Sequence, residues 1–157
     1  MNRINYKSLL ICLFIPLAIG GLSALFTMGS MKDFEALKQP PLSPPGWIFP
    51  VVWTVLFILM GIASYLVLQT AARTQDKKSA FKAYFIQLAF NFLWSIIFFS
   101  FGAYEIAFVW LLVLFALIAI TTVRFLRINK LSGILMLPYL LWVAFAGYLN
   151  VAIAYLN

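Results

Sequence analysis

The sequence predicts an all-α membrane protein, a bundle of five transmembrane helices that forms a single domain over residues 1–157. Apolar residues make up 65% of the chain and charged residues only 10%, whereas a soluble domain is about 45–50% apolar and about 25% charged. Five apolar runs each approach the roughly 20 residues that a helix needs to cross the hydrocarbon core of a bilayer. These runs are apolar on all sides, unlike the alternating strands of a membrane barrel.

The first predicted span covers about 9–28 and follows the basic residues Arg3 and Lys7. A cleaved signal peptide also begins with basic residues before an apolar stretch. This run is long and no clear small-residue cleavage pattern ends it, so we expect it to remain as a span. Gly20 and Ala24 lie one turn apart and are expected to let a neighbouring helix approach closely.

A polar segment, 30–46, separates the first span from the second and ends in four prolines, Pro40, Pro41, Pro44 and Pro45. Proline lacks the N–H that a helix needs and pushes the preceding residue toward extended geometry. We therefore expect a stiff, extended loop, called here the lid loop, that leads into the second span at about 47–72. Pro50 is compatible with the first turn of that helix.

The remaining spans are predicted at about 83–102, 106–123 and 134–156. A polar loop over 73–79 precedes the third span, and a short turn around Glu105 precedes the fourth. Pro138 lies near the predicted start of the fifth span. It either bends that helix and opens a pocket, or marks a plain helix start.

The basic residues predict the orientation of the bundle. Nine of the 11 Lys and Arg residues lie at the N-terminus, in the second loop and in the fourth loop, which share one side of the membrane. Only Lys32 and Lys38 lie on the other side. Because basic loops stay in the cytoplasm, we expect an integral protein of the cell membrane, with a cytoplasmic N-terminus and an external C-terminus.

Composition excludes several kinds of chemistry. The chain has no His, so a Ser-His-Asp triad is impossible. Cys12 is the only cysteine, so no internal disulfide can form. The four acidic residues fall in or beside loops. We therefore expect neither a metal-binding cluster nor a buried carboxylate for ion coupling. No required cofactor is expected. The basic residues orient the chain, and we expect no nucleic-acid partner.

Polar and aromatic residues form stripes on two predicted helices, because residues three or four apart share a helical face. The stripes are Gln87, Asn91, Trp94, Ser95 and Phe98 on the third span, and Tyr139, Trp142, Ala146, Leu149 and Asn150 on the fifth. An unpaired amide in an apolar medium costs about 2–7 kcal/mol, so the two asparagines should face the bundle. They either hydrogen-bond between helices or also line a pocket for a planar apolar ligand.

Three separated motifs resemble one known family. They are Gln39 to Trp47 with Pro50, Val52-Trp53-Thr54 and Met60-Gly61; Gln87-Leu88, Asn91-Phe92 and Trp94; and Leu137-Pro138-Tyr139, Trp142, Phe145-Ala146 and Leu149-Asn150. In this order they resemble the TspO/MBR family of tryptophan-rich sensory proteins and translocator proteins, also called peripheral benzodiazepine receptors. The likeness covers all five predicted spans.

The resemblance implies a receptor or sensor that contacts the lipid bilayer and binds porphyrins such as protoporphyrin IX, isoquinoline carboxamides or benzodiazepines beneath the lid loop. It implies a homodimer as well. It places the ligand-binding residues at Trp47, Phe49, Asn91, Trp94, Trp142, Ala146 and Leu149. The alternatives are light- and oxygen-dependent porphyrin breakdown, with Trp47 and Trp142 as catalytic residues, or porphyrin transport.

The lid loop departs from the family pattern. Phe34 lies roughly where the family often has a Trp-Tyr pair, and Leu42 lies roughly where it often has Trp. Gln39 stands before Pro40 where the family usually has Lys. No basic residue follows Tyr148 or Tyr155, as the cholesterol pattern of animal members would require.

Overall fold

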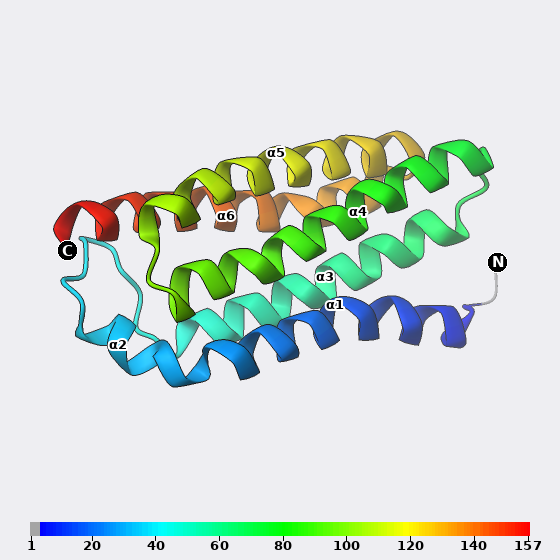
Figure 1. Ribbon diagram of the computed structural model, residues 1–157. Helices are drawn as coiled ribbons and strands as arrows, with labels where there is room; N and C mark the ends of the chain where they lie inside the picture. Colours follow the sequence, from blue (N-terminus) through cyan, green and yellow to red (C-terminus); the bar gives the residue numbers. More distant parts are fainter. Residues whose placement is uncertain (1–3) are drawn as a thin grey trace.

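Within residues 4–157, which the computed structural model describes, every regular element is helical (Figure 1). Arg3, one of the basic residues counted for the orientation, lies outside this range. Five helical segments are long and apolar enough to cross a membrane, which confirms the predicted fold class. The elements are α1 (Tyr6–Thr27), η1 (Met28–Ser30), α2 (Met31–Ala36), α3 (Ile48–Gln69), α4 (Thr74–Ser95), η2 (Ile96–Ser100), α5 (Tyr104–Ile128) and α6 (Lys130–Leu156).

The long helices lie side by side, and the start of α1 and the end of α6 lie at opposite ends of the bundle (Figure 1). Helix α5 packs against α6 and α4, and α3 packs against α1 and α6. Helix α1 is the least buried of the five and packs mainly against α3. It therefore forms an outer wall of the bundle.

Close packing joins α1 to α3. A Cβ atom on Gly61 would lie 2.8 Å from Leu13 Cα, and one on Gly20 would collide with the ring of Phe57. The absence of a side chain at these two positions lets the helices approach, as small residues do at membrane helix interfaces. This confirms the expectation for Gly20.

The helices extend beyond the apolar runs into polar sequence. The segment 73–79 was expected as a loop, but α4 begins at Thr74. Asp76 lies in the first turn of α4, where a negative charge stabilises the helix by interacting with its unpaired N–H groups. Asp76 Oδ2 also pairs with Arg73 Nε at 3.3 Å. Helix α6 begins at Lys130, because the side chain of Asn129 caps it.

The lid loop is not extended throughout, and this corrects the expectation for 30–46. Residues Met31–Ala36 form α2, because they include good helix formers and one apolar anchor, Phe34, which is buried. A tight turn follows, in which Ser43 N donates to Pro40 O at 3.2 Å and Leu42 adopts a φ of 69°. The segment crosses the end of the bundle, from α2 toward the end of α6 (Figure 1).

Candidate functional site

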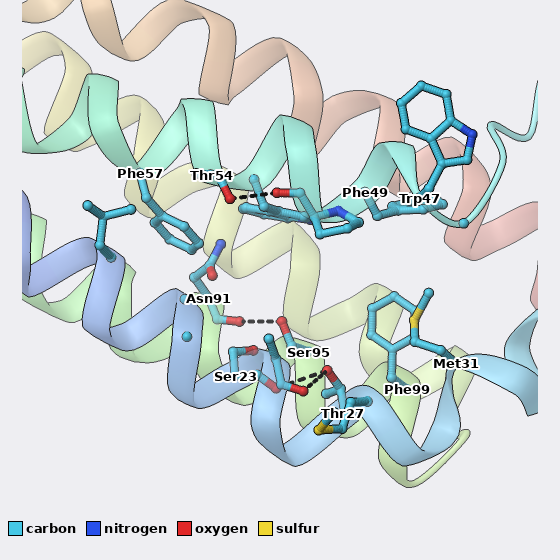
Figure 2. A pocket seen from close by; sticks show the side chains of 18 of the residues that line it. Ser23, Thr27, Met31, Trp47, Phe49, Thr54, Phe57, Asn91, Ser95 and Phe99 are labelled. Carbon is cyan, nitrogen blue, oxygen red and sulfur yellow. Dashed lines mark hydrogen bonds between the residues drawn. The ribbon is translucent and has the colours of Figure 1, made fainter.

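A cavity of about 530 Å³ lies between α1, α3 and α4 (Figure 2). This volume is within the range of about 300–1,000 Å³ typical of small-molecule sites. Met31 and Glu35 of α2 line it beside Gly46 and Trp47, and we call this end of the cavity its mouth. The first turns of α3 supply aromatic side chains, among them Phe49, Trp53 and Phe57. Helix α4 and η2 supply Asn91 and Phe99 from the opposite side. The cavity is therefore largely apolar, with a few polar groups.

Aromatic rings pack together at the end of the bundle where α2 lies. Phe34 on α2 is buried, and its ring centroid lies 5.8 Å from that of Phe49, 5.8 Å from that of Phe98 and 5.2 Å from that of Phe99. Aromatic pairs at such distances stabilise by about 0.5–1.5 kcal/mol beyond area burial. Phe34 therefore anchors α2 over the cavity.

A chain of buried hydrogen bonds orients Asn91 in the cavity wall. Tyr139 Oη donates to Gln87 Oε1 at 2.8 Å, so its oxygen accepts from Asn91 Nδ2 at 2.9 Å. A hydroxyl has one proton to donate, and this fixes the direction of the chain. The Oδ1 of Asn91 has no hydrogen-bond donor within residues 4–157 and is the amide atom left for a ligand.

Three hydroxyl groups of the cavity wall donate to carbonyls of their own helices. Thr27 donates to Ser23 O at 2.9 Å, Thr54 to Pro50 O at 2.7 Å, and Ser95 to Asn91 O at 3.3 Å (Figure 2). Each hydroxyl then presents oxygen lone pairs, which accept hydrogen bonds. The polar part of the wall is therefore rich in acceptors.

Hydrogen bonds tie the lid loop to α6. Tyr148 Oη donates to Pro41 O at 2.7 Å. The Asn157 side chain accepts from Lys38 N at 2.9 Å and donates to Lys38 O at 3.2 Å. We call these contacts the α6 latch. They hold the segment after α2 in place across the end of the bundle.

The model of the TspO/MBR family matches residues 12–156. The chain belongs to the TspO/MBR family. It is similar to "Tryptophan-rich protein TspO" of Chlorobaculum tepidum, with 36% identity over 100% of this chain and 99% of the relative. It is also similar to "Tryptophan-rich sensory protein" of Cereibacter sphaeroides, with 35% identity over 79% and 76% of the two chains. "Translocator protein" of Bos taurus is 32% identical over 87% and 82%.

Of the ligand-binding residues that the TspO/MBR resemblance places on this chain, three line the cavity: Trp47, Phe49 and Asn91. Trp47 lies at the mouth and is 68% exposed, with its ring turned away from the other labelled side chains (Figure 2). Of the lid prolines, Pro40 is buried, whereas Pro41 and Pro45 are exposed and Pro44 is half-buried.

The other four predicted residues lie deeper or on another side of the bundle. Trp94, Ala146 and Leu149 are buried, and Trp94 Nε1 donates to Asn150 Oδ1 at 3.3 Å. The asparagines therefore do form the hydrogen bonds between helices that the sequence suggested. Trp142 lies across Phe49 from the cavity, with the ring centroids 6.1 Å apart.

Trp142 instead lines a second hollow of about 510 Å³ between α3 and α6. Apolar residues such as Val55, Leu141 and Phe145 form most of it, and Pro138 lies beside them. The indole Nε1 of Trp142 is buried without a hydrogen-bond partner within residues 4–157. The structure thus separates Trp142 from Trp47.

Several cavity residues were not predicted as site residues. They include Ser23 and Thr27 on α1, Glu35 on α2, and Trp53 and Phe57 on α3. The small and hydroxyl side chains of α1 recur about every turn. This spacing in the sequence could have predicted that α1 forms a wall of the cavity. Within residues 4–157, no group of three or more His, Cys, Asp and Glu residues could hold a metal ion.

Proposed function

We propose that this protein is a membrane receptor or sensor that binds porphyrins such as protoporphyrin IX, and other planar apolar ligands, in the cavity between α1, α3 and α4. The observation that carries the proposal is the cavity itself, an aromatic space of about 530 Å³ with Asn91 as a fixed polar contact. Flat rings favour aromatic walls, and a few polar groups set their orientation. The names of two relatives, a tryptophan-rich sensory protein and a translocator protein, agree with a role in sensing or translocation.

The expected path of a ligand follows from the exposed side of the cavity. Helix α1, the least buried helix, forms one wall, and the mouth lies beside α2 and the lid loop. We propose that the protein resides in the cell membrane with its N-terminus in the cytoplasm, so that the lid loop faces the outside. A homodimer belongs to the same proposal.

Two glycines give a matched test of the binding site. Gly21 lines the cavity, whereas Gly29 does not, and a Cβ atom at either position meets nothing within 4 Å. A phenylalanine at Gly21 should occupy ligand space without disturbing the packing around it. We expect Gly21→Phe to weaken protoporphyrin IX binding about tenfold or more and Gly29→Phe to leave it unchanged. Tryptophan quenching of the purified protein in non-ionic detergent measures both affinities.

If the wild-type protein shows saturable quenching and both variants bind with the same affinity, the porphyrin binds outside this cavity. Asn91→Ala is the second variant. It removes the free amide oxygen in the wall, and we expect it to lower the affinity about fivefold. No saturable quenching in the wild-type protein would overturn the proposed function itself.

Breakdown of porphyrin in light and oxygen is a second candidate function, because indoles line the cavity at Trp47 and Trp53. The Trp53 ring lies 6.3 Å from that of Trp94. Loss of the porphyrin absorption bands under light, slowed by Trp47→Phe or Trp142→Phe, would support this function. Bands that stay constant under light and oxygen would exclude it. Porphyrin flux into liposomes tests the transport alternative.

A further inference from the structure

Among the described residues, 4–157, Glu35 is the only ionisable one that lines the cavity (Figure 2 shows most of the lining residues). The other lining residues are apolar, aromatic, hydroxyl or amide side chains. Asp33, Lys32 and Lys38 belong to the same segment of the chain but do not line the cavity. A single carboxyl side chain therefore lies at the mouth, where α2 meets the start of α3.

The position of the carboxylate is set by Gly46. A Cβ atom on Gly46 would collide with Glu35 Oε1, so the absence of a side chain there creates the space that the carboxylate occupies. Phe34, the neighbouring residue, is buried among three other rings and fixes α2. Glu35 is exposed on its other side. The carboxyl group is thus held at the mouth between α2 and Gly46.

The polar groups deeper in the cavity resemble this carboxyl group in their hydrogen-bonding character. Asn91 presents its Oδ1, and the hydroxyls of Thr27, Thr54 and Ser95 present oxygen lone pairs. These groups offer hydrogen-bond acceptors to a ligand, and the indoles of Trp47 and Trp53, which also line the cavity, carry N–H donors. Neither the wall nor the mouth contains a Lys or Arg side chain that would pair with a carboxylate.

We infer that Glu35 is a specificity-determining residue that selects flat ligands whose solvent-facing edge is neutral or basic, and discriminates against ligands that carry carboxylates at that edge. The inference rests on the proposed function. A bound porphyrin keeps its carboxylates in water, because burying an unpaired charge is costly. The proposed function places the lid loop outside the membrane, so carboxylates kept in water at that end of the cavity lie near Glu35 and are repelled by it.

The experiment compares protoporphyrin IX, which carries two carboxylates, with its uncharged dimethyl ester. Two unit charges about 4 Å apart in water repel strongly enough to lower an affinity about fivefold. We expect Glu35→Gln to raise the affinity for protoporphyrin IX about threefold to tenfold and to leave that for the ester unchanged. Added salt should reproduce part of this gain in the wild-type protein and not in the variant, because salt screens exposed charges.

Asp33→Asn is the matched control, since it removes a negative charge from the same short helix at a residue outside the cavity. It should change neither affinity by more than about twofold. If Glu35→Gln alters both ligands alike, or neither, or if Asp33→Asn has the same effect as Glu35→Gln, the selection by Glu35 is refuted while porphyrin binding stands. If wild-type protein binds neither the acid nor the ester, the proposed function fails instead.

Discussion

Tyr139 is the central group of the buried hydrogen-bond chain, and its hydroxyl is the most informative atom to remove. Tyr139→Phe deletes the bond from Asn91 Nδ2 at 2.9 Å and the bond to Gln87 Oε1 at 2.8 Å. Hydrogen bonds between membrane helices contribute about 0.6 kcal/mol on average and up to about 1.7 kcal/mol each. Both amides are buried and lose a partner. We therefore expect the variant to lower the free energy of unfolding by about 1–3 kcal/mol.

The matched control is a second buried tyrosine. Tyr84 is 2% exposed, and its Oη has no hydrogen-bond partner within residues 4–157. The hydroxyl of Ser64 on α3 donates to Gly61 O at 2.9 Å. Tyr84→Phe should therefore cost less than about 0.5 kcal/mol, because it removes a buried hydroxyl that makes no hydrogen bond.

Reversible unfolding of the detergent-solubilised protein by added sodium dodecyl sulfate, followed by tryptophan fluorescence, measures both variants. The reasoning predicts that Tyr139→Phe unfolds at clearly lower denaturant fraction than Tyr84→Phe. Equal stabilities for the two variants would show that the chain of hydrogen bonds contributes nothing, and that the two tyrosines act only through their rings.

Two further predictions concern helix packing and the lid loop. Gly61→Ala places a Cβ atom 2.8 Å from Leu13 Cα, so it should destabilise the protein by about 1–3 kcal/mol through overpacking. Gly21→Ala is the control, because a Cβ atom there meets nothing within 4 Å. It should leave the free energy of unfolding unchanged in the same assay. Tyr148→Phe removes the hydrogen bond to Pro41 O and should raise the rate of amide hydrogen exchange in the lid loop severalfold; unchanged exchange would show that this bond does not restrain the loop.

The sequence predicted the number of spans and the inward orientation of the amides from physical necessity. A run of about 20 apolar residues has few other stable states in lipid, and a buried amide must find a partner, as Asn91 and Asn150 do. The ends of the helices were less predictable. Polar residues continue a helix past the membrane core, as at Thr74, because hydropathy indicates depth in the bilayer and not where backbone hydrogen bonding stops.

The side of the bundle on which each aromatic ring lies could not be predicted. Helical spacing shows that Trp142 and Ala146 share a face, but it does not show which neighbour that face meets. In the structure Ala146 is buried and Trp142 lies between α3 and α6, beyond Phe49. The position of Glu35 could not be predicted either, because the sequence predicted an extended loop for this segment. The packing of Phe34 brings α2, which carries Glu35, to the mouth of the cavity.

The α6 latch has a consequence for how the protein is made. Its residues, Tyr148 and Asn157, lie more than 100 positions after the loop residues that they hold, with separations of 107 for Pro41 and 119 for Lys38. A chain is synthesised from its N-terminus, so α1, the lid loop and α3 are made while these partners are still missing. Every residue that lines the cavity lies before residue 100, so the cavity wall precedes its latch, and a nascent chain arrested before α6 has inserted has its lid loop unlatched.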